Sequence, residues 1–192
     1  MPTGILLAAG FSRRFGGNNK LLHPLPDGRA VALAAAQSLM QALPTAIAIV
    51  RPENHELAEL LMAAGLQVFT CGEHEQEMAD SLAAAVRYSS AFAASDKGFV
   101  IALADMPYIR PETILAVANA LTSGTSIVVP TYQNQRGHPV GFAAKFRSEL
   151  EALRGDEGAR SILKRHQSEV YMLECDDAGI LADIDTPSDL KA

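Results

Sequence analysis

Short apolar runs alternate with longer amphipathic stretches along the whole 192-residue chain. The short runs predict strands, because strands buried on both faces of a parallel sheet read as nearly continuous apolar segments. The predicted strands are Thr3–Ala9, Ala46–Arg51, Gln67–Cys71, Phe99–Ala104, Ser126–Pro130, a short stretch after Pro139, and Glu169–Leu173. The run at 99–104 is the most apolar of them, which predicts a central position in the sheet.

The longer stretches predict helices, with Gly65 as a C-terminal cap and Pro111 in a first turn. They cover Arg29–Leu43, Glu53–Ala64, Met78–Phe92, Pro111–Leu121, Lys145–Leu153, Gly158–His166 and Pro187–Lys191. Alternating strands and helices predict an α/β fold: a three-layer α/β/α sandwich with a mostly parallel, Rossmann-like sheet. The length suits a single domain over residues 1–192. Such sheets bind ligands at the carboxyl ends of their strands, so residues that follow strands are the candidates for chemistry.

Composition narrows the classes of partner. The net charge of −6 argues against a nucleic-acid partner, so a bound nucleotide would be neutralised by a few placed cations. Cys71 and Cys175 lie far apart without a Cys-x-x-Cys motif, which argues against a disulfide scaffold or zinc ribbon and favours a reducing cytosol. The first apolar run precedes its basic residues, the reverse of a secretory signal, and no apolar stretch approaches the ~20 residues of a membrane span. We therefore expect a cytoplasmic protein without a membrane partner.

The segment LAAGFSRRFGGNNK, Leu7–Lys20, directly follows the first predicted strand. Its glycines allow close backbone approach, its backbone N–H groups can bind an anion, and Arg14 and Lys20 can neutralise phosphate charge. The segment is neither a Walker A loop nor a G-x-G-x-x-G motif. The pattern favours a triphosphate site, and the alternative is a solvated basic turn.

This segment resembles the signature L-A-A-G-x-S-x-R-[M/F]-G-x-x-x-K of the MobA-like nucleotidyltransferases, which transfer nucleoside monophosphates to small acceptors. The resemblance, which later motifs extend over nearly the whole chain, implies that the backbone of Leu7, Ala8, Ala9 and Gly10 contacts the base and ribose. It also implies that Arg14 and Lys20 contact the phosphates.

Two aspartate motifs provide candidate metal ligands. Asp105, in LADMP, ends the most apolar strand, where a carboxylate can face the crevice and hold Mg²⁺; the alternative is a loop cap. In ADIDTPSDL, a helix start explains Thr186, Pro187 and Asp189 but leaves Asp185 unexplained. The family pattern D-[I/V]-D-T-P-x-D-L implies that Asp185 joins Asp105 on Mg²⁺, with Asp183 the less favoured ligand.

Two further motifs point to an acceptor. In QNQRGHPVGF, His138 could act as an acid or base, donate a hydrogen bond, or be held in a turn. The R-G-H-P element at Arg136–Pro139, with Gly137, His138 and Pro139 as acceptor-binding candidates, resembles the cytidylyl branch of the molybdopterin-directed enzymes. So does L-A-A-G, where guanylyl enzymes carry L-A-G-G. Both features favour CTP, and the Ala9 methyl narrows the room for a purine. In RGDEGARSILKRH, Asp156 can cap a helix with Arg160 in its first turn, and the resemblance places Arg160 near the acceptor.

One motif departs from the family. Where relatives carry G-[ML]-x-x-S-[LV] to hold the base and ribose, this chain has Glu77-Met78-Ala79-Asp80-Ser81-Leu82. The match implies nucleotide contacts by Ala79, Asp80 and Ser81. Glu77 and Asp80 replace small residues, which indicates either an acidic first turn that complements a helix dipole or a changed base or acceptor preference.

These motifs together predict Mg²⁺-dependent nucleotidyl transfer with release of pyrophosphate, with Lys20, Arg14 and Asp105 as catalytic residues and CTP as the favoured donor. The resemblance implies that molybdopterin is the acceptor of the CMP group. A molybdoenzyme or its chaperone would be the downstream partner. The first alternative is transfer to a sugar phosphate or polyol phosphate. The second is a nucleotide- or cofactor-binding accessory protein of low turnover.

Overall fold

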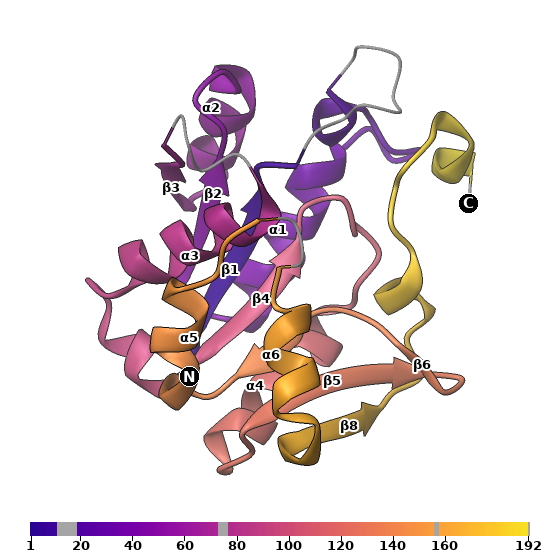
Figure 1. The fold of residues 1–192 in the computed structure, drawn as a ribbon. Helices are drawn as coiled ribbons and strands as arrows, with labels where there is room; N and C mark the ends of the chain where they lie inside the picture. Colours follow the sequence, from indigo (N-terminus) through magenta and orange to yellow (C-terminus); the bar gives the residue numbers. More distant parts are fainter. Residues whose placement is uncertain (11–18, 73–76, 156–157, 192) are drawn as a thin grey trace.

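A computed structural model describes residues 1–10, 19–72, 77–155 and 158–191 (Figure 1). In these ranges one eight-stranded sheet has the order β3-β2-β1-β4-β7-β5-β6, with β8 paired to β5. The strands are β1 Thr3–Ala8, β2 Ala46–Val50, β3 Gln67–Thr70, β4 Phe99–Leu103, β5 Ile127–Tyr132, β6 Gln135–Arg136, β7 Val140–Phe142 and β8 Val170–Glu174. The α-helices are α1 Val31–Ala42, α2 His55–Ala63, α3 Met78–Ser89, α4 Pro111–Thr122, α5 Arg147–Glu151 and α6 Arg160–Arg165. Within the same ranges, none of the helices is long and apolar enough to span a membrane.

The sheet is mostly parallel, as predicted, but one central strand is reversed. β1 pairs in parallel with β2 and β4, β2 with β3, and β5 with β8, whereas β7 is antiparallel to both β4 and β5. Val140, the first residue of β7, lies opposite Ile101 of β4. The residues that precede β7 therefore lie at the same edge of the sheet as the residues that follow β1 and β4.

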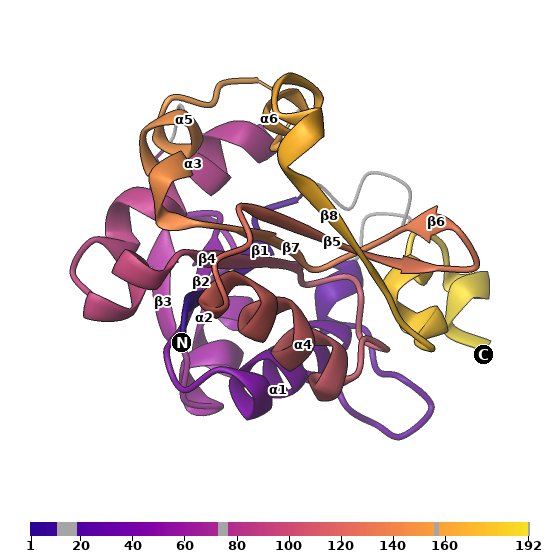
Figure 2. The same cartoon turned by 90° about the horizontal axis from the view of Figure 1, so that it is seen from below.

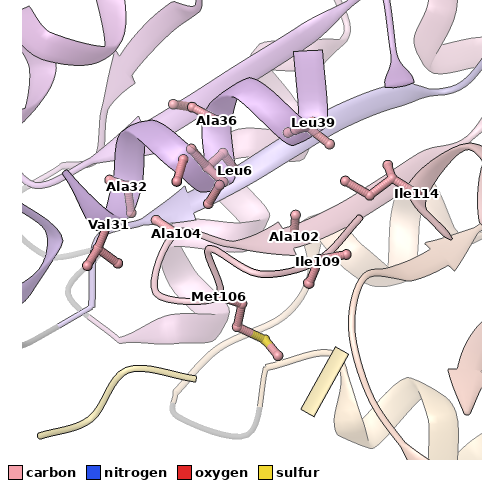
Figure 3. Packing of buried hydrophobic residues seen from close by; sticks show 14 of the residues in the cluster. Leu6, Val31, Ala32, Ala36, Leu39, Ala102, Ala104, Met106, Ile109 and Ile114 are labelled. Carbon is pink, nitrogen blue, oxygen red and sulfur yellow. The ribbon is translucent and has the colours of Figure 1, made fainter. Parts of the chain in front are cut away.

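The sheet is covered on both faces, which confirms the three-layer prediction (Figure 2). Side chains of successive strand residues point to opposite faces, so Leu6 packs in the cluster under α1 and α4, whereas Ile5 packs in the cluster under α3, α5 and α6. Figure 3 shows the first cluster, in which α1 lies against β1 and β4. Met106 and Ile109 belong to the same cluster, so the segment that follows β4 is anchored by buried side chains on both sides of Tyr108.

Most predicted elements shift by one or two residues at an end, and three differences have a visible local cause or consequence. α3 ends at Ser89, three residues before the predicted Phe92, and the Ser89 hydroxyl donates to the carbonyl of Val86. α6 begins at Arg160 because Gly158 has φ +55°, outside the helical region. The short strand β6 was not predicted; it pairs with the end of β5 through a turn at Gln133 and Asn134, both with positive φ.

Candidate active site

Lys20 joins the two predicted metal ligands. Its Nζ donates hydrogen bonds to Oδ2 of Asp105 at 2.8 Å and to Oδ1 of Asp185 at 3.0 Å. The Lys20 side chain is 11% exposed, while those of Asp105 and Asp185 are 23% and 43% exposed. One ammonium thus bridges two carboxylates that are 80 positions apart in the chain and both open to solvent.

The pKa of Lys20 reflects this environment. Burial alone lowers it, but the hydrogen bonds and charges of Asp105 and Asp185 more than offset burial and raise the pKa above its ordinary value of 10.5. Because the folded-state pKa is the higher one, the stabilisation is fully present below pH 10.5 and is lost as the pH rises through the raised value. Lys20 is therefore a cation throughout the physiological range.

Backbone contacts place the two aspartates. Asp105 lies two residues beyond β4, and its carbonyl accepts a hydrogen bond from the Ile184 N–H at 2.8 Å, which fixes the residue next to Asp185. Oδ2 of Asp189 accepts the N–H groups of Asp185 and Thr186 at 3.0 and 2.7 Å, the reach-back contact expected of this helix start. The Thr186 N–H bond is the main reason that the pKa of Asp189 is lowered. Asp183 is exposed.

The carboxylate pair fits a divalent cation. Carboxylate oxygens are the protein ligands that Mg²⁺ prefers, and the two oxygens already share one cationic group, the Lys20 ammonium. No cluster of three or more His, Cys, Asp or Glu side chains suited to a metal occurs among the described residues. Mg²⁺ in nucleotide sites usually has one or two protein carboxylates and completes its shell with phosphates and water.

The predicted nucleotide-binding residues of β1 lie at the same edge. The Leu7 carbonyl accepts the Ala104 N–H at 3.0 Å, which ties the end of β1 to the residue before Asp105. Ala8 and Ala9 are buried. Gly10 is exposed, and no atom of the described residues lies within 4 Å of where a Cβ would stand. Arg14 lies outside the described residues.

The start of α3 offers one accessible side chain among its three predicted nucleotide contacts. Ala79 and Ser81 are buried, and the Ser81 hydroxyl donates to the Met78 carbonyl. Asp80 is half-buried in the first helical turn, where its charge complements the helix dipole. Glu77 is exposed, and its side chain makes no capping hydrogen bond to the helix. The acidic residue in the first turn of α3 is therefore Asp80, and Glu77 does not act as a side-chain cap.

Of the predicted acceptor-binding residues, His138 lies within electrostatic reach of Asp105. Gly137 is packed so tightly that a Cβ would lie 2.3 Å from the carbonyl oxygen of Ile180, which accepts the His138 N–H at 3.1 Å. The peptide bond between His138 and Pro139 is cis. The His138 ring is half-buried, and its Nδ1 is buried without a hydrogen-bond partner among the described residues.

Burial lowers the pKa of His138 below 6.5; the Asp105 charge opposes this, and the exposed Arg160 at the start of α6 adds to it. A lowered histidine pKa means that its contribution to stability is present above pH 6.5 and is lost as the pH falls through the folded-state value. The ring is therefore neutral at pH 7, which suits a hydrogen-bonding role more than a charged one. The Asp156 cap proposed for the neighbouring helix lies outside the described residues.

The two charges acting on His138 can be separated by titration. We expect Asp105→Asn to lower the His138 pKa further and Arg160→Gln to raise it, because each substitution removes one opposing influence. NMR titration of the imidazole signals measures both shifts. Arg165→Gln is the matched control on the same helix, since Arg165 pairs with Glu149 at 3.1 Å. If His138 has the same pKa in the wild type and in all three variants, Asp105 and Arg160 do not act on its ring as inferred.

Asp177 is a buried charged residue that the sequence motifs did not single out. It is 2% exposed and accepts hydrogen bonds from the backbone of Gly179 and Arg110 and from the Thr113 hydroxyl. An aspartate two residues before a glycine is a known turn signal, so the local turn could have been predicted. The contact with α4, 64 to 67 positions away, has no local signal.

Comparisons with known proteins show the family to which the chain belongs. Residues 4–170 match the MobA-like NTP transferase domain. The purine catabolism protein PucB of Bacillus subtilis (strain 168) is 30% identical over 194 residues, covering 97% of this chain and 92% of PucB. The nicotine blue oxidoreductase of Paenarthrobacter nicotinovorans is 26% identical over 191 residues, covering 96% of this chain and 92% of that protein.

Solved structures show the same fold. The crystal structure of Rv0371c from Mycobacterium tuberculosis H37Rv superimposes with a TM-score of 0.80 at 29% identity, covering 97% of this chain and 93% of that one. A second structure of Rv0371c, in complex with manganese, gives a TM-score of 0.77 at 27% identity, covering 97% and 94%. The match over residues 4–170 and the similarity to PucB show that the chain belongs to the MobA-like NTP transferase family and is a nucleotidyltransferase.

Proposed function

We propose that this enzyme transfers CMP from CTP to molybdopterin in a Mg²⁺-dependent reaction that releases pyrophosphate. The observation that carries the proposal is the Lys20–Asp105–Asp185 cluster, at the edge of the sheet where β1 and β4 end. Two carboxylates for a metal and one lysine for phosphate charge are the groups that nucleotidyl transfer requires.

The reaction is an in-line displacement. An oxygen of the acceptor's phosphate attacks the α-phosphorus, the new P–O bond forms as the bond to the β-phosphate oxygen breaks, and pyrophosphate leaves with that electron pair. Asp105 and Asp185 would hold Mg²⁺, which when bound neutralises phosphate charge. Lys20 donates to the α-phosphate and the leaving pyrophosphate, and Arg14 is proposed to assist. Leu7–Gly10 and Ala79–Ser81 hold the nucleoside, which supplies the orientation that such reactions need.

Preference for CTP rests on Ala9 and on the element Arg136–Pro139. Ala9 is 5% exposed and packs in the same cluster as Cys71 and Ala79 at the start of α3. We infer that its methyl reduces the room for a purine base at the end of β1. His138, neutral and beside Asp105, would donate or accept a hydrogen bond from the acceptor side.

The choice of molybdopterin as acceptor rests on the family resemblance of Gly137–Pro139 and Arg160. Gly137 and His138 are held by the Ile180 carbonyl, and Arg160 is exposed within electrostatic reach of His138. This provides a neutral ring and a cation near the proposed metal ligands, a combination that suits a phosphorylated heterocycle. The manganese complex of Rv0371c supports divalent-metal dependence of the reaction.

Pyrophosphate release tests the substrates directly. The enzyme is incubated with Mg²⁺, one of CTP, GTP, ATP or UTP, and molybdopterin. We expect release with CTP to exceed release with GTP by at least about tenfold, the scale of discrimination that pocket size can provide. Reactions without acceptor, and with a sugar phosphate or a polyol phosphate in its place, are the controls. No release with any NTP would contradict molybdopterin as the acceptor, and equal release with GTP would contradict the assignment of CTP.

A further inference from the structure

The segment 177–185, here called the C-terminal strap, carries the chain from β8 to Asp185 and begins at a buried carboxylate. Oδ1 of Asp177 accepts the Gly179 N–H at 3.0 Å. Oδ2 accepts the Arg110 N–H at 2.9 Å and the Thr113 hydroxyl at 2.7 Å. Arg110 is the residue before α4, and Thr113 lies in the first turn of this helix. Asp177 thus caps α4 from a distant part of the chain and suits the positive end of its dipole.

The strap is then fixed against two loops of the active site. A Cβ on Gly179 would lie 2.1 Å from the Tyr108 carbonyl oxygen, so strap and loop are in backbone contact. The Ile180 carbonyl accepts the His138 N–H at 3.1 Å. Four residues later, the Ile184 N–H donates to the Asp105 carbonyl at 2.8 Å. The contacts run from Asp177 along the strap and end at the residue before Asp185.

We propose that Asp177 is a positioning residue that places Asp185 beside Asp105 and Lys20 by holding the strap against the loop between β4 and α4. This inference rests on the proposed role of Asp185 as a metal ligand. An uncharged side chain at this place would leave α4 without its anionic cap. An asparagine amide would also set a donor against the N–H of either Gly179 or Arg110. The strap would no longer be held at its first residue. The position of Asp185 beside Asp105 and Lys20 would therefore become less fixed.

The chain provides a matched control next to the residue. Asp176 is exposed, so Asp176→Asn removes the same charge one position earlier without touching α4. Thr113→Val removes a single donor to Asp177 at nearly constant volume and serves as the milder variant if Asp177→Asn does not fold. Asp185→Ala serves as the reference for loss of the metal ligand itself.

Two measurements test the inference. Hydrogen exchange of the Ile184 amide should accelerate at least about tenfold in Asp177→Asn, with amides of β1 unchanged and Asp176→Asn equal to wild type. Thr113→Val should show the same selective pattern with a smaller increase. Mn²⁺ binding in the presence of CTP, followed by electron paramagnetic resonance, should weaken by about 10- to 100-fold in Asp177→Asn, the range for residues that orient metal ligands.

The outcomes separate this inference from the proposed function. If Asp185→Ala weakens Mn²⁺ binding but Asp177→Asn does not, Asp177 does not position the ligand. If exchange accelerates equally in β1 and at Ile184, Asp177 stabilises the fold as a whole and the inference is wrong. If Asp185→Ala binds Mn²⁺ as tightly as wild type, the metal role of Asp185 fails, whereas selective exchange at Ile184 would still establish that Asp177 fixes the strap.

Discussion

Asp105→Asn is expected to lower the rate of pyrophosphate release by about 10³-fold, with little loss of stability. Asparagine has nearly the same shape and can still accept the hydrogen bond from Lys20, and the Asp105 backbone contact with Ile184 is untouched. What disappears is the negative charge that a divalent ion needs. Steady-state pyrophosphate release at saturating CTP and Mg²⁺, together with thermal unfolding of each protein, measures the two effects.

Asp183→Asn provides the control for this substitution. Asp183 is exposed and lies two residues before Asp185, so the same chemical change is made close to the site but outside it. Its rate should equal that of wild type. If Asp105→Asn releases pyrophosphate at the wild-type rate, Asp105 is not a metal ligand. If both variants lose the same fraction of the rate, the effect comes from the change in net charge and not from the metal site.

Lys20→Met is expected to change metal binding and catalysis in opposite directions. Without the ammonium, Asp105 and Asp185 repel each other and no cation must be displaced, so Mn²⁺ should bind several-fold more tightly when nucleotide is absent. Pyrophosphate release should fall by about 10²- to 10³-fold, because the charge that stabilises the transition state is gone. Electron paramagnetic resonance of Mn²⁺ and the pyrophosphate assay check the two effects.

Lys145→Met is the comparison for this variant. Lys145 forms an ion pair with Glu169 at a more exposed position. Its substitution therefore removes a lysine charge and an ion pair away from the Lys20–Asp105–Asp185 cluster. Both its Mn²⁺ affinity and its rate should stay at the wild-type level. Weaker Mn²⁺ binding by Lys20→Met would mean that the lysine helps the carboxylates to hold the ion, contrary to the competition inferred from the geometry.

The sequence predicted most of the elements and the edge of the sheet at which Lys20, Asp105 and Asp185 lie together. Apolar runs such as Phe99–Ala104 and proline at the start of α4 are local signals, and the structure follows them within a residue or two. The reversed direction of β7 was not predictable, because three residues carry no information about the direction in which they pair. The hairpin between β5 and β6 was missed because its turn uses Gln133 and Asn134 in place of glycine.

The site could be predicted only in part. Asp105 follows β4, and Lys20 ends the segment that follows β1. Because ligands bind at the carboxyl ends of the strands in such sheets, these two residues could be expected near each other. Asp185 follows no such strand; its pairing with Asp105 came from the family resemblance, and the strap contacts now give it a physical cause. The Asp177 cap depends on residues 64 to 67 positions away, and no local pattern reports a contact of that kind.

The reversal of β7 has a consequence for how acceptor preference can diverge among such enzymes. The chain runs along β5, turns at the exposed pair Gln133 and Asn134 into β6, and reaches β7 through Gly137–Pro139 at the edge where β1 and β4 end. Residues added at that tip would lengthen the hairpin while leaving the register of β1 and β4 unchanged. If Gly137–Pro139 contact the acceptor as proposed, this one hairpin could be remodelled for a new acceptor while the Lys20–Asp105–Asp185 cluster is kept unchanged.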